Sequence, residues 1–403
     1  MNSFDSSPSL TAWRTLLALA VVFVMLATTG WTALQRNGQH GTARESALSA
    51  WEKGRIGVLD LPDPGSSPRR LAAFFASLTA AQRVRLADRY PLVVGNLNGA
   101  PLTLRYRANR LAVLQARDDE RARMRDDRVS VEGQHQAGRR MHRFESMAAD
   151  GRRILAFDPT GAGRAAEVFG DLGSATRVSV VVPGVDTNLL TFERTDRPFT
   201  APVGMAGSLY DAERAASPRT RTAVIAWADY TAPSGVGVDA ATGRLASDGA
   251  ERLNALTSAL PGDSRVSLIC HSYGSVVCGL AARQLPDRVT DVAVAGSPGM
   301  RAGSAGQLET HARVWAMRDQ DDWIQVLPYL EVGGLGHGAD PMTPDFGARV
   351  LSARGAAGHG GYFEPGTESL ENFADIGVGS YRNTSCADAG DACRSGISGD
   401  EVI

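Results

Sequence analysis

The sequence lacks several features that mark particular classes of protein. It has four cysteines among 403 residues and no Cys-x-x-Cys pair, so the paired-cysteine pattern of redox and zinc sites is absent. The 42 basic residues nearly balance the 44 acidic ones, and a net charge of -2 provides no strong field for a nucleic-acid backbone. We therefore expect no nucleic-acid partner. A hydrophobic content of 43% and a charged content of 21% exclude a disordered chain, a coiled coil and a polytopic membrane protein.

The chain contains one long uncharged apolar run, from Leu16 to Leu34. This run is close to the ~20 residues that cross a bilayer, and it predicts a retained signal anchor and hence a membrane contact. The alternative is a cleaved signal peptide with its apolar core over Leu16 to Ala27. Trp31 interrupts the small-residue cleavage pattern, which favours the anchor. We expect a membrane-anchored protein with an extracytoplasmic globular part, or a secreted protein if the signal is cleaved.

The four cysteines fall into two kinds of surroundings. Cys386 and Cys393 close a short loop in a polar, Gly-rich tail, which predicts an extracytoplasmic disulfide, with two free thiols as the alternative. Cys270 and Cys278 lie within apolar segments, and we expect them to be small buried apolar side chains.

The pattern of apolar, polar and charged residues changes along the chain. After the signal segment (1–35) comes a polar linker (36–65), followed by a prefix of charged helices (66–153) whose mixed charges indicate a solvated face. From Ile154, short apolar runs alternate with helix-length amphipathic stretches, which is typical of an α/β fold with a mostly parallel sheet covered by helices on both faces. We expect this domain over 154–380 and a polar tail over 381–403. The candidate strands are ILAFD (154), VSVVVPGV (178), TAVIAWADY (222), RVSLICHS (265), VTDVAVAGSP (289) and ARVWAMRD (312).

The segment RVSLICHSYGSVVCGLAARQL has the pattern of a strand, a sharp turn and a helix. Ser272 lies in the turn, with Cys270 two residues before it and Gly274 two residues after it. A nucleophile elbow needs small residues at both places because the strand and the helix pass close together. Ser272 is therefore the candidate nucleophile, and a helix N-cap is its alternative role.

A serine nucleophile needs a base, and after such an elbow the acid and then the histidine follow along the chain. In RDQDDWIQVLP we expect Asp322 to be the acid, ahead of Asp319 and then Asp321, because a carboxylate after a strand can orient an imidazole. His337 and His359 both lie far enough downstream to be the base. The residues alone leave that choice open.

Backbone N–H groups are expected to stabilise the oxyanion of such a site. One is that of Tyr273, directly after the nucleophile, and the other is that of Val185 in the turn that follows VSVVV. We expect no cofactor and no metal. A metal site is a weak alternative, because its candidate ligands lack the close helical spacing of zinc ligands. Those candidates are His311, His337, Asp340 and His359.

A set of ordered motifs extends well beyond the elbow: VVPGVDTNL, WADYTAP, CHSYGS, GSPG, DDWI, HGADP and HGGYF. At these motifs the chain resembles a family of α/β-hydrolase-fold proteins, found mainly in actinobacteria and long catalogued as a domain of unknown function. The resemblance implies Ser272 as nucleophile, the Asp of DDWI, taken as Asp322, as acid, and His359 as base. It thereby favours His359 over His337. The chain departs from the family at Cys270, where glycine is usual.

These features together predict a serine hydrolase that cleaves a carboxylic ester, of a small molecule or a lipid, through an acyl-enzyme. Acyl transfer to an alcohol uses the same three residues and is one alternative. A non-catalytic interaction module on the same scaffold is the other. The Gly-rich region 331–361 is expected to form a lid over acyl chains.

Overall fold

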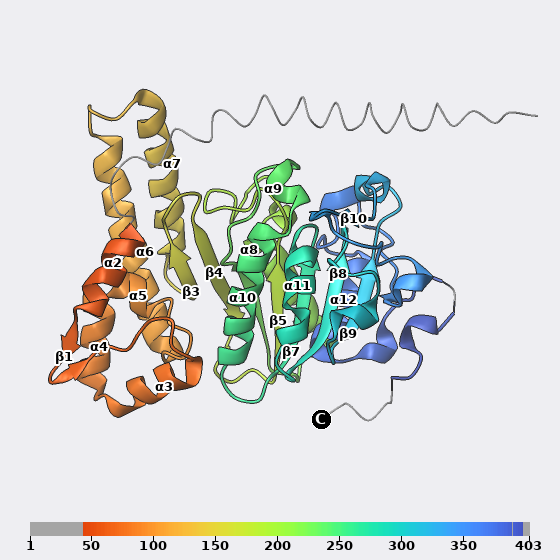
Figure 1. The fold of residues 1–403 in the computed structure, drawn as a ribbon, viewed down its shortest axis with the longest axis horizontal. Helices are drawn as coiled ribbons and strands as arrows, with labels where there is room; N and C mark the ends of the chain where they lie inside the picture. Colours follow the sequence, from red (N-terminus) through yellow and green to blue (C-terminus); the bar gives the residue numbers. More distant parts are fainter. Residues whose placement is uncertain (1–42, 389, 398–403) are drawn as a thin grey trace, which may run out of the picture. The chain divides into compact units, whose positions relative to one another are not determined.

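The computed structural model describes residues 43–388 and 390–397, and its centre is an eight-stranded sheet. Figure 1 shows this sheet with helices on both sides. The strand order is β12-β9-β8-β7-β5-β6-β4-β3. The strands of this sheet are β3 (Ile154–Asp158), β4 (Arg164–Gly170), β5 (Arg177–Val182), β6 (Thr222–Ala228), β7 (Arg265–His271), β8 (Val289–Ala295), β9 (Arg313–Met317) and β12 (Arg349–Val350). Two small hairpins are β1 (Arg55–Ile56) with β2 (Leu59–Asp60), and β10 (Glu331–Val332) with β11 (Leu335–Gly336).

The α-helices lie before and between these strands. They are α2 (Ala43–Glu52), α3 (Pro68–Ser77), α4 (Ala80–Arg89), α5 (Pro91–Val94), α6 (Leu102–Met124), α7 (Val131–Met147), α8 (Pro202–Ala216), α9 (Val238–Ala241), α10 (Arg244–Ala259), α11 (Gly274–Ala281) and α12 (Glu368–Val378). No helix among residues 43–388 and 390–397 is long and apolar enough to cross a membrane. The run Leu16–Leu34, expected to be a signal anchor or signal peptide, lies outside the described residues.

The sheet confirms the predicted α/β class. Strands β12, β9, β8, β7, β5 and β6 are parallel to one another, whereas β4 is antiparallel to β6 and β3 is antiparallel to β4. Each of the six predicted runs contains a strand. Because the parallel strands share one direction, β5, β7, β8 and β9 all end at the same edge of the sheet. The loops that follow these strands meet there.

Strand β4 is not among the predicted strands. Its sequence, RAAEVFG, carries a glutamate in the middle, which breaks the apolar run expected of a buried strand. Glu167 is nevertheless buried, because Arg152 lies against it and forms an ion pair. A charge can occupy a central strand only when such a partner is present, and that partner is a tertiary contact.

Alternate side chains of the central strands enter two apolar cores, one on each face of the sheet. Val180 of β5 packs in a core with Leu253 of α10 and Val277 of α11. Its neighbour Val181 packs in the other core with Phe373 of α12 and with residues of α8. Strands covered on both faces must be apolar throughout, which explains their continuous runs.

The helical prefix completes the sheet at its β3 end. The amide of Asn96 donates to the carbonyl of Phe157 at 2.8 Å and accepts from its N–H at 3.0 Å, as a neighbouring strand does. Asn109 of α6 donates to the carbonyl of Ile154 at 3.0 Å. These contacts satisfy backbone groups that an edge strand otherwise exposes.

The charged residues of the prefix do not all form the solvated face that we expected. Arg140 of α7 and Glu120 of α6 are both buried, and their Nε and Oε1 atoms lie 2.6 Å apart. Arg105 is buried as well and donates to the carbonyl of Leu155 at 2.9 Å. Part of the charge pattern therefore joins the helices to one another and to the sheet.

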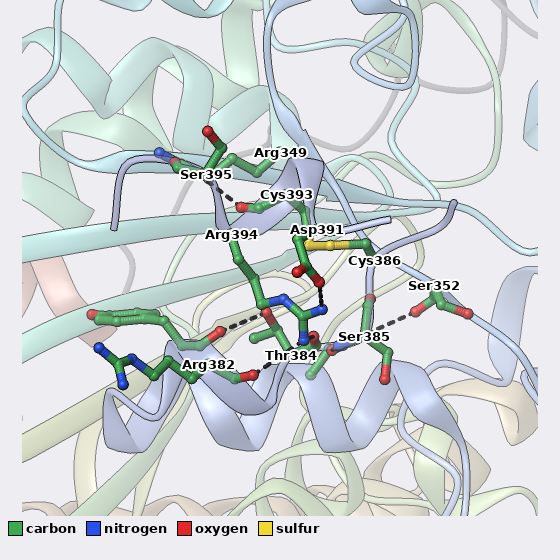
Figure 2. The surroundings of a disulfide bond; sticks show 12 residues. Arg349, Ser352, Arg382, Thr384, Ser385, Cys386, Asp391, Cys393, Arg394 and Ser395 are labelled. Carbon is green, nitrogen blue, oxygen red and sulfur yellow. Dashed lines mark hydrogen bonds and ion pairs between the residues drawn. A yellow bond between two sulfur atoms is a disulfide. The ribbon is translucent and has the colours of Figure 1, made fainter. Parts of the chain in front are cut away.

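Segments expected to be a linker and a tail pack against the folded unit. The expected linker 36–65 includes α2, whose Trp51 is fully buried and donates to the carbonyl of Pro62 at 2.7 Å. In the tail, Cys386 and Cys393 form the expected disulfide (Figure 2). Arg349 of β12 donates to the carbonyl of Cys393 at 2.8 Å and so ties this loop to the sheet.

Candidate active site

Ser272 lies in a strained turn directly after β7. Its φ of 54° is in the left-handed region, which residues other than glycine rarely adopt and which often marks a functional site. The helix α11 begins two residues later, at Gly274. A Cβ at Gly274 would lie 2.2 Å from the carbonyl oxygen of Val182, so only glycine fits there. The turn therefore has the geometry of a nucleophile elbow.

The structure brings Ser272, His359 and Asp322 together from three loops. His359 Nε2 lies 2.9 Å from Ser272 Oγ. His359 Nδ1 lies 2.9 Å from Oδ1 and 3.0 Å from Oδ2 of Asp322. Ser272 follows β7, Asp322 follows β9, and His359 lies between β12 and α12. These distances allow a proton to pass between the hydroxyl and the imidazole while the carboxylate orients the ring.

The carboxylate of Asp322 is fully buried and has three hydrogen-bond donors. Besides His359, these are the N–H of Ile324 at 2.9 Å and the hydroxyl of Tyr362 at 2.5 Å. Burial by itself raises the pKa of Asp322, but the bonds from His359, Tyr362 and Ile324 lower the pKa below its ordinary value. Asp322 is therefore an ionised carboxylate at neutral pH and can accept the hydrogen bond from His359 Nδ1.

Two buried side chains hold the loop that carries His359. His271 Nε2 lies 2.7 Å from the carbonyl oxygen of His359, and a carboxylate oxygen of Asp319 accepts from the N–H of Gly358 at 3.0 Å. Burial, with His359 as a second cause, lowers the pKa of His271 to about 3. His271 is neutral at neutral pH, and its Nε2 carries the proton because a carbonyl can only accept.

The sequence analysis did not assign roles to His271 or Tyr362. The signals were present, since His271 directly precedes the candidate nucleophile and Tyr362 belongs to the HGGYF motif. Asp319, the second choice for the acid, holds the histidine loop instead. Asp321, the third choice, is exposed at the surface.

The turn after β5 lies against Ser272, as expected for an oxyanion site. A Cβ at Gly184 would lie 2.6 Å from the Cβ of Ser272. The hydroxyl of Tyr230 donates to the carbonyl of Pro183 at 2.6 Å and so fixes the turn. Within the described residues, the N–H groups of Tyr273 and Val185 have no hydrogen-bond acceptor. Their role as oxyanion donors stays a prediction.

The expectation for Cys270 and Cys278 is wrong in one respect. Both side chains are fully buried, as expected, but they form a disulfide with each other. The bond joins the end of β7 to the middle of α11 and spans the elbow around Ser272. Sequence spacing could not reveal it, because the bend of the elbow is what brings the two Cα atoms to 6.6 Å.

The remaining candidates lie away from the triad. His337 Nε2 contacts the carbonyl oxygen of Ala240 at 2.6 Å, and Asp340 forms an ion pair with Arg318 at 2.7 Å. Over residues 43–388 and 390–397, no three His, Cys, Asp or Glu side chains gather in a way that could hold a metal ion.

The sheet order, the serine elbow after β7 and the acid and histidine loops at the carboxyl edge define an α/β hydrolase fold. Residues 158–332 match a family described as "Alpha/beta hydrolase". An uncharacterized protein of Mycobacterium tuberculosis is 29% identical over 380 residues, covering 80% of this chain and 57% of that protein. An uncharacterized protein of Mycobacterium bovis is 34% identical over 167 residues, covering 40% of this chain and 58% of that protein.

These matches confirm the resemblance to an actinobacterial α/β-hydrolase family of unknown function. The chain spans little more than half the length of these relatives. Among solved structures, it is similar to a predicted hydrolase from Thermoplasma acidophilum, with 16% identity and a TM-score of 0.36, over 58% of this chain and 97% of that one. It is also similar to a Xanthomonas campestris protein described as a serine hydrolase without a lid, with 14% identity and a TM-score of 0.31, over 58% and 96% of the two chains.

Proposed function

We propose that this protein is a serine hydrolase that cleaves a carboxylic ester through an acyl-enzyme on Ser272. The observation that carries the proposal is the hydrogen-bonded chain from Ser272 Oγ through His359 to the buried carboxylate of Asp322. The strained backbone of Ser272 is a second, independent support. Such strain persists only where the surrounding fold holds the residue in place, and strained residues cluster at functional sites.

The proposed reaction has two halves. Ser272 Oγ attacks the ester carbonyl carbon while its proton moves to His359 Nε2, and the N–H groups of Tyr273 and Val185 hold the oxyanion. The bond to the alcohol oxygen then breaks, and His359 gives its proton to the departing alcohol. In the second half a water molecule attacks the acyl carbon, its proton passes to His359 and then to Ser272 Oγ, and the carboxylic acid leaves. An alcohol in place of that water would make the same site an acyltransferase.

We also propose that the protein works outside the cytoplasm. Its two disulfides support this, because such bonds persist in oxidising compartments. In this proposal the apolar run Leu16–Leu34 anchors the protein in the membrane, or directs its secretion if it is cleaved.

Labelling of the full-length protein by a fluorophosphonate probe tests the proposed chemistry. The probe reacts only with an activated serine, so Ser272→Ala and His359→Ala should both abolish labelling. Ser247→Ala and His311→Ala are matched controls, since both residues are exposed and lie outside the triad, and these variants should label like the wild type. A folded wild-type protein that does not label would refute the proposal and favour the non-catalytic interaction module.

A further inference from the structure

An exposed apolar surface borders the candidate active site. Of the twelve large apolar side chains that are most exposed among the described residues, eight belong to two segments of the chain. Six of them lie between Trp323 and Leu335, and the other two are Val236 and Val238. We call these eight side chains the apolar rim. The six are Trp323, Val326, Leu327, Leu330, Val332 and Leu335.

The two segments of the apolar rim lie side by side near Ser272. Leu335 forms a backbone bridge with Thr242, just after the segment that carries Val236 and Val238. The carbonyl of Thr242 accepts from the hydroxyl of Tyr273, the residue after the candidate nucleophile, at 3.0 Å. In Figure 1, α9 and the β10 hairpin lie at the same end of the sheet.

The rim also touches the catalytic groups directly. The ring of Trp323 lies 4.8 Å from that of His359, measured between centroids, and 45% of Trp323 remains exposed. Trp323 directly follows Asp322 in the chain. Trp323 therefore links the exposed segment to the imidazole.

Hydrogen bonds from two side chains to backbone carbonyls hold the segment in place while its apolar side chains face solvent. The hydroxyl of Tyr329 donates to the carbonyl of Ser297 at 3.1 Å, and Arg301 donates to the carbonyl of Gly336 at 2.7 Å. The segment is thus tied down through polar groups while Val326 stays 78% exposed and Val332 stays 69% exposed. Large apolar side chains left exposed on neighbouring segments are typical of a site that binds an apolar partner.

The few charged side chains of the rim indicate which kind of apolar partner it binds. Between Trp323 and Leu335 the only charged side chain is Glu331, and it forms an ion pair with Arg301 at 2.8 Å. This segment therefore has no cluster of free cations that would attract an anionic headgroup, and beside Val238 the charges of Asp239 and Arg244 pair with each other at 3.5 Å. A neutral or zwitterionic lipid surface fits it.

We propose that the apolar rim binds the surface of an aggregated, water-insoluble lipid ester and passes its acyl chain along Trp323 to Ser272. This inference rests on the proposed function and names the substrate class of the same site. The region that we expected to form a lid over acyl chains would instead bind the lipid surface, because the apolar side chains of the hairpin β10–β11 already face solvent.

The test uses residues 42–403, which form one compact unit. This unit contains the two cores of the sheet and a third apolar core around Trp51 and Phe75. The probes are a dissolved short-chain p-nitrophenyl ester and a long-chain p-nitrophenyl ester dispersed in phosphatidylcholine vesicles. The double variant Val326→Ser with Val332→Ser should lower the ratio of the dispersed to the dissolved rate by about tenfold. The matched control is Val58→Ser with Val131→Ser, whose valines are 86% and 68% exposed and lie before the sheet domain, and its ratio should not change.

Flotation with phosphatidylcholine vesicles, carried out on Ser272→Ala protein, separates the two proposals. Binding that is lost with the rim variant and kept with the control supports the rim, even if the wild type proves not to be an esterase. An unchanged rate ratio together with unchanged flotation would overturn the inference. So would a dimer in sedimentation that dissociates in the rim variant without any vesicle binding, because the surface would then belong to a second copy of the chain.

Discussion

Replacing Gly296 by alanine tests the contact between the acid and the base of the triad. Gly296 follows β8 with a φ of 54°, and a Cβ there would lie 2.8 Å from Oδ2 of Asp322 and 3.0 Å from Nδ1 of His359. Contacts of 3.4–4 Å are ordinary for such a carbon, so the methyl group must push the carboxylate or the imidazole away. The displacement is about 0.5 Å, which lengthens hydrogen bonds of 2.9 and 3.0 Å beyond their usual range.

The expected loss of rate follows from this displacement. Misplacing a catalytic group by about 1 Å costs ~10²-fold, and losing the acid's control of the imidazole costs up to ~10⁴-fold. We therefore expect Gly296→Ala to slow fluorophosphonate labelling of Ser272 by about tenfold to 10²-fold. Alanine in the left-handed region also costs about 1–2 kcal/mol of stability, which is a separate effect.

Gly161→Ala separates the two effects. Gly161 has a φ of 62° and no atom within 4 Å of a new Cβ, so this variant carries the backbone cost without the contact. The assay is the second-order labelling rate, with thermal unfolding of each variant measured alongside. Gly161→Ala should label like the wild type at a slightly lower Tm. If folded Gly296→Ala protein labelled within twofold of the wild type, the reasoning about the triad would be refuted.

Three further predictions concern groups around the site and in the core. Replacing Cys270 and Cys278 together by alanine should lower the free energy of unfolding by about 2–3 kcal/mol, because their disulfide closes a loop with a sequence separation of 8; an unchanged urea midpoint would contradict this. Burial raises the pKa of Glu213 to about 8 from 4.5, so the folded state keeps a proton that the unfolded chain releases, and stability falls as pH rises between these values. Glu213→Gln should remove about 4 kcal/mol of that fall, which urea unfolding at pH 4.5 and at pH 8 measures, and an unaltered dependence of stability on pH would count against it. His271→Asn should slow labelling by about tenfold, since the loop of His359 loses one hydrogen bond, and an unaffected rate would assign His271 to packing alone.

Much of the fold is encoded locally and could be predicted from the sequence. Buried parallel strands are continuous apolar runs, so β5, β7 and β8 are visible without any partner. The elbow is equally local, because the strained turn at Ser272 needs small residues within two positions of it. Strand β4 is the exception, since its buried Glu167 depends on Arg152.

Which of several aspartates and histidines lies beside Ser272 can be decided only from the tertiary structure. His359 is 37 residues from Asp322 and 87 residues from Ser272 in sequence, so spacing carries no information about their contact. Three neighbouring aspartates were open as acids, and only the direction in which the chain leaves β9 brings Asp322 to the imidazole and turns Asp321 to the surface. The catalytic roles themselves stay a prediction until labelling is measured.

The sequence by itself determined six of the strands and the place of the strained serine, because periodicity and turn sterics act between residues close in the chain. Only the tertiary structure decided the disulfide between Cys270 and Cys278, the support of the histidine loop by His271, and the apolar rim beside Trp323. Each of these depends on which side chains the closed fold brings together or leaves facing water. Long-range packing sets that outcome, and no local pattern records it.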